Sequence, residues 1–211
     1  MTANNDTPLL GDTLPVIGLM AADRAGKDTV ANVLVEQGWA KFAFADALKE
    51  AIYVLNPRVA VGYNSFFLRD LLDDNGEEWV KEHSPEYREM LIRFGTETMR
   101  EHLGFQYIWI DKLLQRISSA DKWVIPPKGI VITDVRDPLE VTAVAEELGG
   151  YIIELRSSRG AGHYASDEQL DEMRQRVSYA ITNDSTLEDL HREALMLERL
   201  ILKEYEVEQD V

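Results

Sequence analysis

Short apolar runs alternate with helical patterns along most of the chain. The run LPVIGLM at 14–20 is continuously apolar, which predicts a strand buried on both faces of a sheet. The next stretch, 27–37, carries its apolar residues on one helical face and stops at Gly38. The run WAKFAFA at 39–45 predicts a second strand. The N-terminal part is therefore expected to begin as strand, helix, strand.

The same alternation returns in the C-terminal part of the chain. Apolar runs at 130–133, 151–155 and 177–182 predict three more strands. The sequence DPLE at 137–140 predicts the start of a helix, because a cap residue, a proline and a glutamate stand at the right spacing. A capping box at STLE, 185–188, predicts the start of a last helix. This alternation indicates a three-layer α/β fold with a five-stranded parallel sheet.

The alternation breaks in the middle of the chain, which has helical patterns instead. A helix is predicted from Ser84 to about Arg100. A helical insertion in an α/β core is a usual place for a substrate-binding subdomain, so we expect one domain over 14–203 with such an insert. Its parts are a core at about 14–55 and 129–203, a helical insert at about 56–128, and flexible ends at 1–13 and 204–211.

Composition limits the classes of function. The chain has 22 Lys and Arg against 38 Asp and Glu, a formal net charge of −16, and a field of that sign repels nucleic-acid phosphates. We therefore expect no nucleic-acid partner. The absence of cysteine excludes disulfides, thiolate metal sites and a cysteine nucleophile. No apolar run approaches the ~20 residues needed to cross a membrane, and the polar stretch 1–12 predicts no secretion signal, so a cytoplasmic location and no membrane partner are expected.

The main chemical signal is the stretch ADRAGKDT at 22–29, between the first strand and the first helix. A loop in this position can aim backbone N–H groups at a phosphate, and the helix dipole favours the anion. Gly26 allows close approach, and Lys27 can reach the β- and γ-phosphates of a nucleotide. Ala21 replaces the first glycine of the G-x-x-x-x-G-K-[ST] pattern, and Asp28 replaces its Mg²⁺-binding hydroxyl. A polar turn that only caps a helix is the alternative, but the flanking elements favour a phosphate loop.

A second signal is Asp134, which directly follows the apolar run at 130–133. An acid at the carboxyl end of a central parallel strand faces the ligand crevice. It could bind Mg²⁺ through water or accept a proton from an attacking hydroxyl. A solvated aspartate at the end of a strand is the alternative, and the phosphate loop favours the catalytic interpretation.

Five segments together resemble the deoxynucleoside monophosphate kinase family known from bacteriophages, over about residues 14–203. The segments are DRAGKDT (23–29), FADALKEA (44–51), YREMLIRFGTETMR (87–100) with Trp109, VITDVRDPLE (131–140) and ITNDSTLEDL (181–190). GKDT alone also occurs in other small P-loop kinases. The order GTE, tryptophan, DVR and TND is more specific.

The resemblance implies a P-loop fold like that of nucleoside monophosphate kinases and the reaction ATP + dNMP = ADP + dNDP with Mg²⁺. The ATP site would then consist of Asp23, Arg24, Ala25, Gly26, Lys27, Asp28 and Thr29. The acceptor site would consist of Leu48, Lys49, Arg69, Arg88, Gly95, Thr96, Trp109, Asp134 and Arg136. The expected catalytic residues are Lys27, Asp134 and Arg136, and the expected metal ligand is Asp28.

A closing lid is expected after the fourth strand, where kinases of this shape have one. Arg156 and Arg159 are its candidate cations, and the segment up to Arg174 is expected to be mobile. The family often has a short His-x-[ST]-Glu segment before the last strand. Its counterpart around His163 is loose, so no role follows for that histidine.

Other functions stay open at this point. Trp109 lines the nucleobase pocket if the resemblance holds, and core packing is the alternative, because aromatic residues at helical spacing are usually buried.

A P-loop kinase for another small acceptor, such as dephospho-CoA or phosphomevalonate, would share the core. A third hypothesis is a nucleotide-binding regulator without catalysis. The sequence does not decide which bases are accepted, whether ribose is excluded, or whether the chain is a monomer or a homodimer.

Overall fold

The structure is a computed structural model that describes residues 14–119, 123–160 and 166–209. Two compact units divide the chain: residues 44–115 form one, and the segments on both sides of that stretch form the other. The boundaries of these units differ from those of the expected insert at 56–128. The helix that begins at Asp46 belongs to the same unit as the insert. Within the described ranges, no helix is both long enough and apolar enough to span a membrane.

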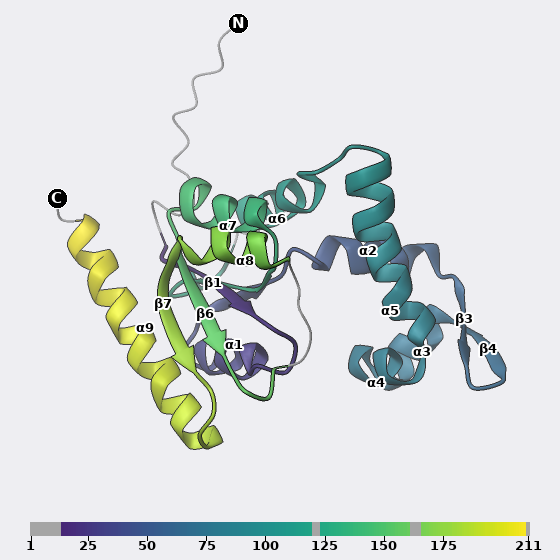
Figure 1. Ribbon diagram of the computed structural model, residues 1–211, viewed down its shortest axis with the longest axis horizontal. Helices are drawn as coiled ribbons and strands as arrows, with labels where there is room; N and C mark the ends of the chain where they lie inside the picture. Colours follow the sequence, from purple (N-terminus) through teal and green to yellow (C-terminus); the bar gives the residue numbers. More distant parts are fainter. Residues whose placement is uncertain (1–13, 120–122, 161–165, 210–211) are drawn as a thin grey trace, which may run out of the picture. The chain divides into compact units, whose positions relative to one another are not determined.

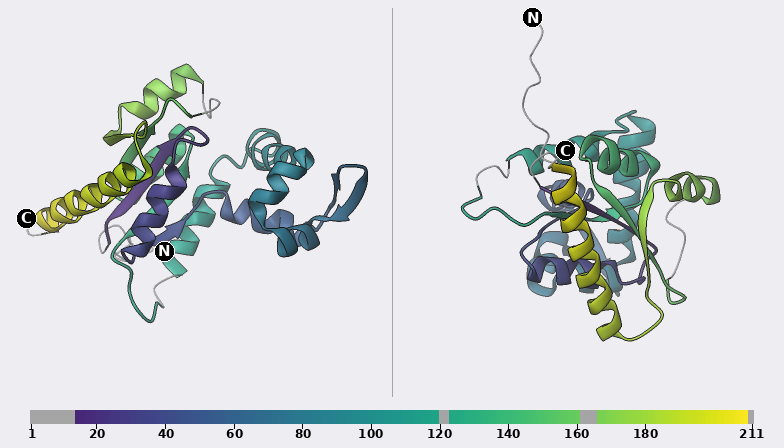
Figure 2. Two further views of the ribbon diagram at one scale, coloured as in Figure 1. Left: turned by 90° about the horizontal axis from the view of Figure 1, so that it is seen from below. Right: turned by 90° about the vertical axis from the view of Figure 1, so that its left-hand side faces the viewer.

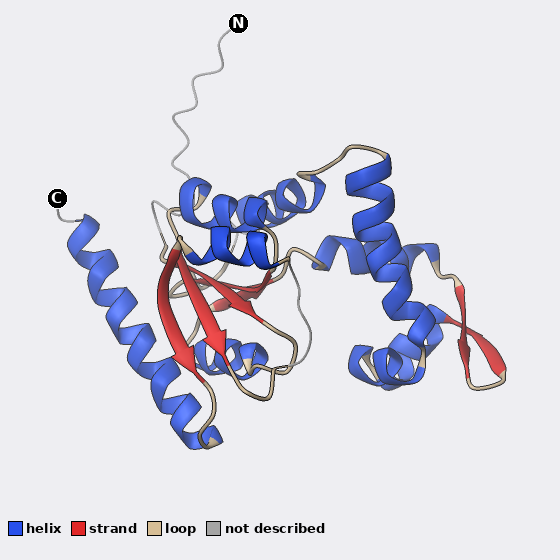
Figure 3. Ribbon diagram, in the orientation of Figure 1, coloured by secondary structure: helices blue, strands red, loops and turns tan. Residues whose placement is uncertain are grey.

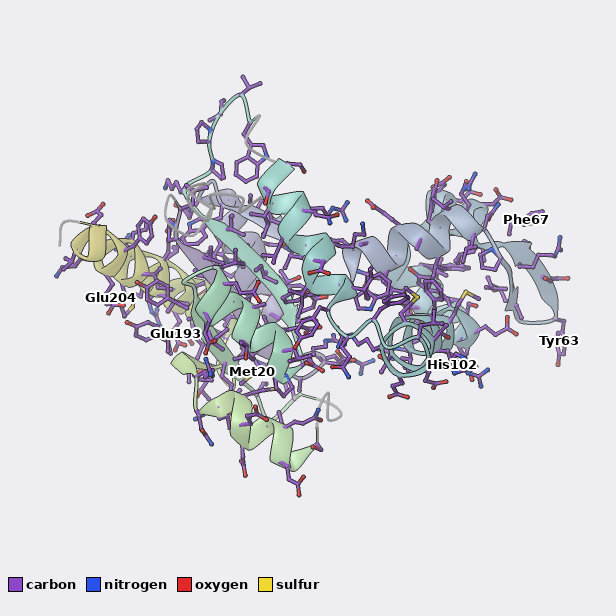
Figure 4. The ribbon with its side chains drawn as sticks, turned by 90° about the horizontal axis from the view of Figure 1, so that it is seen from above. Met20, Tyr63, Phe67, His102, Glu193 and Glu204 are labelled. Carbon is purple, nitrogen blue, oxygen red and sulfur yellow. The ribbon has the colours of Figure 1, made fainter. Side chains whose placement is uncertain are left out.

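The first unit contains a sheet of five parallel strands (Figures 1 and 3). The strands are β1 (Val16–Ala21), β2 (Ala40–Phe42), β5 (Ile130–Val135), β6 (Tyr151–Arg156) and β7 (Val177–Thr182). Their order across the sheet is β2-β5-β1-β6-β7. All six residues of β1 are buried, including Met20 (Figure 4), as its continuous apolar run predicts. The predicted five-stranded parallel sheet is confirmed.

Helices cover both faces of this sheet, which gives the three predicted layers (Figure 2). On one face α1 (Lys27–Glu36) packs against α9 (Leu187–Gln209), and both contribute to an apolar core with the strands. On the other face lie α7 (Pro138–Thr142), the π-helix η4 (Ala143–Glu147) that continues it, and α8 (Asp167–Arg174). The fold is therefore a three-layer α/β sandwich.

The helix starts follow from local capping. At α7 the Asp137 carboxylate accepts the Leu139 N–H at 2.8 Å and proline is the first helical residue, as predicted. At α9 the capping box lies one residue later than expected. Thr186 and Asp189 form it, because the Thr186 hydroxyl accepts the Asp189 N–H at 3.1 Å and the Asp189 carboxylate accepts the Thr186 N–H at 3.3 Å.

Two sequence-based expectations for β2 and the C-terminus need correction. The second strand covers only Ala40–Phe42 instead of 39–45, because the chain turns at Ala45 into the next helix. The expected flexible end at 204–211 is helical as far as Gln209, since α9 continues without a break. The Tyr179 hydroxyl on β7 donates to Glu204 (Figure 4) and thereby holds this part of α9 to the sheet.

The second unit is mostly helical. Its helices are α2 (Asp46–Leu55), α3 (Leu68–Asn75), α4 (Glu77–His83), α5 (Pro85–Ile92), the wider-turned η2 (Arg93–His102) and α6 (Ile108–Ser119), which runs on past residue 115. The helix predicted from Ser84 to Arg100 corresponds to α5 and η2. The region was expected to be helical throughout, but it also contains a hairpin of β3 (Arg58–Val61) and β4 (Asn64–Phe67).

The hairpin forms because Gly62 takes φ +60° in the turn, a conformation that favours glycine. Tyr63 lies at its tip (Figure 4). Polar side chains contact the outer edges of both strands: Glu86 accepts the Ala60 N–H at 2.8 Å, and Arg58 donates to the Ser65 carbonyl at 2.6 Å. Such contacts reduce the tendency of an edge strand to pair with another chain.

Candidate active site

The carboxyl ends of β1 and β5 form the topological switch point of the sheet. The two strands are neighbours, but the chain leaves β1 towards α1 on one face and β5 towards α7 on the other. Ligands of open α/β sheets bind in the crevice at such a point. The loop at 22–26 follows β1 there, and Asp134 and Arg136 lie at the end of β5.

The loop at 22–26 has a backbone conformation suited to an anion. The Ala25 N–H donates to the Ala22 carbonyl at 3.2 Å, and Arg24 between them has φ +64°, which is uncommon for a residue with a side chain. Gly26 has φ +101° and precedes α1. Within the described chain no side chain caps this helix start, so the N–H groups of its first turn are not used by a capping side chain. The geometry fits a phosphate.

Three charged side chains meet at the start of α1. The Lys27 ammonium donates to Asp28 Oδ2 at 3.2 Å, and the Lys41 ammonium on β2 donates to Asp28 Oδ1 at 3.4 Å. Burial by itself would raise the pKa of Asp28, but the two ammonium groups outweigh burial and hold this pKa below its ordinary value. Asp28 is therefore ionised at neutral pH and offers carboxylate oxygens of the kind that Mg²⁺ prefers.

The end of β5 contributes a further ion pair. Arg136 Nη2 lies 3.1 Å from Asp23 Oδ1 in the loop, and the Arg136 N–H donates to the buried Glu140 carboxylate at 2.9 Å. Asp134 is half-buried in a bulge, since two residues of β5 stand opposite Leu19 alone. The structure thus brings Asp23 of the expected ATP site next to Arg136 of the expected acceptor site.

The predicted acceptor residues of the second unit fall into two groups. Leu48, Gly95 and Trp109 lie together: a Cβ on Gly95 would lie 2.6 Å from Leu48 Cδ2, and the Trp109 indole N–H donates to the Gly95 carbonyl at 2.9 Å. Trp109 is 7% exposed and also packs against Phe94 with ring centroids 6.4 Å apart. This is the environment that core packing predicts, and a role for the ring at a nucleobase stays a prediction.

The other predicted acceptor residues are spread over the same unit. Lys49 forms an ion pair with Glu77 at 3.1 Å. Arg69 donates to the Tyr53 and Val54 carbonyls at the end of α2, at 3.3 and 3.4 Å. Its guanidinium also lies over the Tyr53 ring. Arg88 and Thr96 are exposed.

The two candidate lid arginines have partners within the first unit. Arg156 donates twice to the buried Glu154 carboxylate, at 2.9 and 2.6 Å, and Arg174 of α8 donates to its other oxygen at 2.9 Å. Burial would raise the pKa of Glu154, but these hydrogen bonds and the positive charges hold it below its ordinary value. Arg159 donates to the Asn183 carbonyl at 2.8 Å. His163 lies outside the described residues.

Two residues of this site were not anticipated from the sequence. Lys41 lies on a short strand, where the sequence pattern predicts only a solvated lysine. No neighbouring residue indicates that Lys41 belongs to a site. Asn183 belongs to the TND motif that carries the resemblance, but no role was assigned to it. Its side-chain amide donates to the Ala25 carbonyl in the loop at 22–26, at 3.0 Å.

A site for Mg²⁺ would have to share its ligands with a substrate. Among the residues that the structure describes, no group of three or more His, Asp or Glu side chains could hold a metal ion. Mg²⁺ commonly uses one or two carboxylates together with nucleotide phosphates and water. Asp28 is a carboxylate in the first turn of α1, next to the loop at 22–26.

Comparisons with known proteins find structural likenesses only. No protein-family model matches the chain. No curated protein sequence matches it. A solved structure from Thermus thermophilus is 14% identical with a TM-score of 0.43 and covers 88% of this chain and 97% of its own. Dephospho-CoA kinase from Campylobacter jejuni is 14% identical with a TM-score of 0.40, and the match covers 88% of this chain and 96% of that chain.

A shikimate kinase from Acinetobacter baumannii, solved in complex with shikimate, is 13% identical with a TM-score of 0.44. The match covers 92% of this chain and 97% of that chain. Such identities and scores are too low to carry a function over to this chain. The function has to be argued from its own residues.

Proposed function

We propose that this protein is a P-loop kinase that transfers the γ-phosphoryl group of ATP to a deoxynucleoside monophosphate. The observation that carries the proposal is the conformation of the loop at 22–26, at the switch point of the sheet. The loop leads to Lys27 at the uncapped start of α1. Its Asp23 forms an ion pair with Arg136, which directly follows β5 in the DVR motif. The five sequence segments that resemble phage deoxynucleoside monophosphate kinases support the choice of acceptor.

The phosphate loop would bind ATP mainly through its backbone. The N–H groups of the loop and of the first turn of α1 would donate to the phosphates. Lys27 would move from Asp28 to the transferring phosphoryl group, where its charge stabilises the transition state. Mg²⁺, when bound, neutralises negative charge on the phosphates, and Asp28 would hold it.

At the carboxyl end of β5, two residues would act on the acceptor phosphate. Arg136 carries a positive charge at the carboxyl end of β5, as an acceptor phosphate requires. Asp134 at the same strand end would accept the proton from the attacking phosphate or orient that group. The resemblance also predicts acceptor-binding roles for Lys49, Arg69, Arg88, Gly95, Thr96 and Trp109.

An ADP-release assay with several acceptors tests the proposal. The acceptors are the four dNMPs, the corresponding ribonucleotides, dephospho-CoA and phosphomevalonate. We expect turnover with at least one dNMP. Lys27→Ala should lower it at least about a hundredfold. Lys203→Ala, at an exposed position of α9, should retain it. Turnover with only a non-nucleotide acceptor would replace the proposed substrate. ATP binding without turnover for any acceptor would favour a regulator.

A further inference from the structure

Asn183 contacts the phosphate loop from the other end of the chain. It directly follows β7, and its Nδ2 donates to the Ala25 carbonyl at 3.0 Å in a buried position. A Cβ on Gly26 would lie 2.5 Å from the same nitrogen, so the amide packs closely against the residue before Lys27. The Ala25 carbonyl of the loop is therefore held by a side chain from a distant part of the sequence.

The other atoms of Asn183 hold the loop that follows β6. Arg159 Nη2 donates to Asn183 Oδ1 at 3.0 Å and to its main-chain carbonyl at 2.8 Å. The Ser157 hydroxyl donates to the same carbonyl at 2.8 Å, and the Asn183 N–H donates to the Arg156 carbonyl at 2.7 Å. One residue thus joins the phosphate loop to the segment that carries Arg159.

The carboxamide of Asn183 suits both side-chain contacts at this position. The Ala25 carbonyl needs a donor, and the Arg159 guanidinium needs an acceptor, and the two ends of an asparagine side chain supply one of each. These partners also fix which end of the amide is nitrogen. An aspartate of the same size would place an oxygen against the Ala25 carbonyl. A serine would be too short to span the same distance.

We propose that Asn183 is a positioning residue for ATP. It holds the turn at Ala25 and Gly26 in the conformation that presents N–H groups to the phosphates, and it keeps Arg159 in a fixed place relative to that turn. The inference rests on the proposed function, because it assumes that this loop binds ATP. Without the amide, the positive φ angles of Arg24 and Gly26 lose a restraint, and ATP has to order the loop on binding.

The test compares Asn183→Asp and Asn183→Ser with the wild-type chain. Both variants remove the Nδ2 donor, and the serine variant does so without a buried charge, so it remains informative if the aspartate variant does not fold. We expect the Kd and KM for ATP to rise about tenfold, the effect of one lost hydrogen bond at a buried carbonyl, while the KM for the acceptor stays unchanged. The neighbouring Thr182→Ala, at an exposed position, should leave both KM values unchanged.

A second control separates positioning from general stability. Ile201→Val removes one methyl group from the buried face of α9 and should lower the midpoint of urea unfolding without affecting ATP binding. If this variant raised the KM for ATP as much as Asn183→Ser, the role of Asn183 would be merely structural. Unchanged ATP affinity in both Asn183 variants would overturn the inference and leave the proposed function intact. A wild-type chain that binds no ATP in calorimetry would overturn both.

Discussion

Replacing Gly26 by alanine tests the geometry of the phosphate loop most directly. An L residue at the observed φ of +101° is strained by about 1–2 kcal/mol. The new Cβ would lie 2.5 Å from Asn183 Nδ2 and 3.1 Å from Leu190 Cδ2, so the amide has to move. The Ala25 carbonyl then loses its hydrogen bond, which costs about 1 kcal/mol. The total is about 2–3 kcal/mol, equivalent to about 30- to 150-fold in a binding constant.

This free energy can be lost in two ways. If the loop keeps its conformation, the free energy of unfolding falls; if the loop rearranges, ATP binding has to restore it and the affinity falls. We therefore expect the two losses together to reach about 2–3 kcal/mol, measured by urea unfolding without ATP and by calorimetric titration with ATP.

Gly149 provides a matched control for the backbone term. It also has a positive φ, +57°, but a Cβ there meets nothing within 4 Å. Gly149→Ala should lose only about 1 kcal/mol of stability and no ATP affinity. If the two losses of Gly26→Ala together do not exceed those of Gly149→Ala, crowding by Asn183 plays no part and the reasoning is refuted.

The remaining predictions concern charged side chains. Lys27→Ala should lower turnover by at least about a hundredfold with little change in urea unfolding, and near-wild-type turnover would contradict the phosphate loop. Arg88→Ala and Arg136→Ala should each raise the KM for the dNMP more than that for ATP; the reverse pattern would move the residue out of the acceptor site. Asp28→Asn should raise the Mg²⁺ concentration needed for half-maximal turnover, and an unchanged requirement would remove Asp28 from the metal site. Glu154→Gln tests pH dependence, because the pKa of Glu154 is held below its ordinary 4.5. The difference in unfolding free energy between wild type and this variant should be constant above about pH 4.5. It should shrink as the pH falls further, because the carboxylate becomes protonated. A difference that stays constant down to about pH 3 would refute this assignment.

The core of the fold could be predicted because its signals are local. Five apolar runs each mark a strand, and the cap residues Asp137 and Thr186 mark helix starts within one residue. The hairpin of β3 and β4 escaped prediction. It is short, all four residues of β4 are exposed, and its aromatic residues do not alternate as a half-buried strand would require.

The site could be predicted only where one segment builds it. The candidate phosphate loop lies between β1 and α1, which are neighbours in sequence, so the position of the loop follows from the pattern alone. The contact of Asn183 with Ala25 joins residues far apart in the chain, and Lys41 reaches Asp28 from another strand. Such contacts depend on the order of strands in the sheet, which no local pattern contains.

The order of segments along the chain has a consequence for folding. Residues 44–115 are continuous, so the second unit can form from neighbouring sequence, whereas the sheet is interrupted by it. β2 lies at the edge of the sheet and its neighbour is β5, with Ala40 opposite Ile130. A chain emerging from the ribosome therefore completes the whole insert before β2 can find its partner, and closing so long a loop slows folding. During that interval β1 is without its neighbours β5 and β6. All six of its residues are buried in the folded sheet, so its exposed apolar surface favours aggregation until they pair.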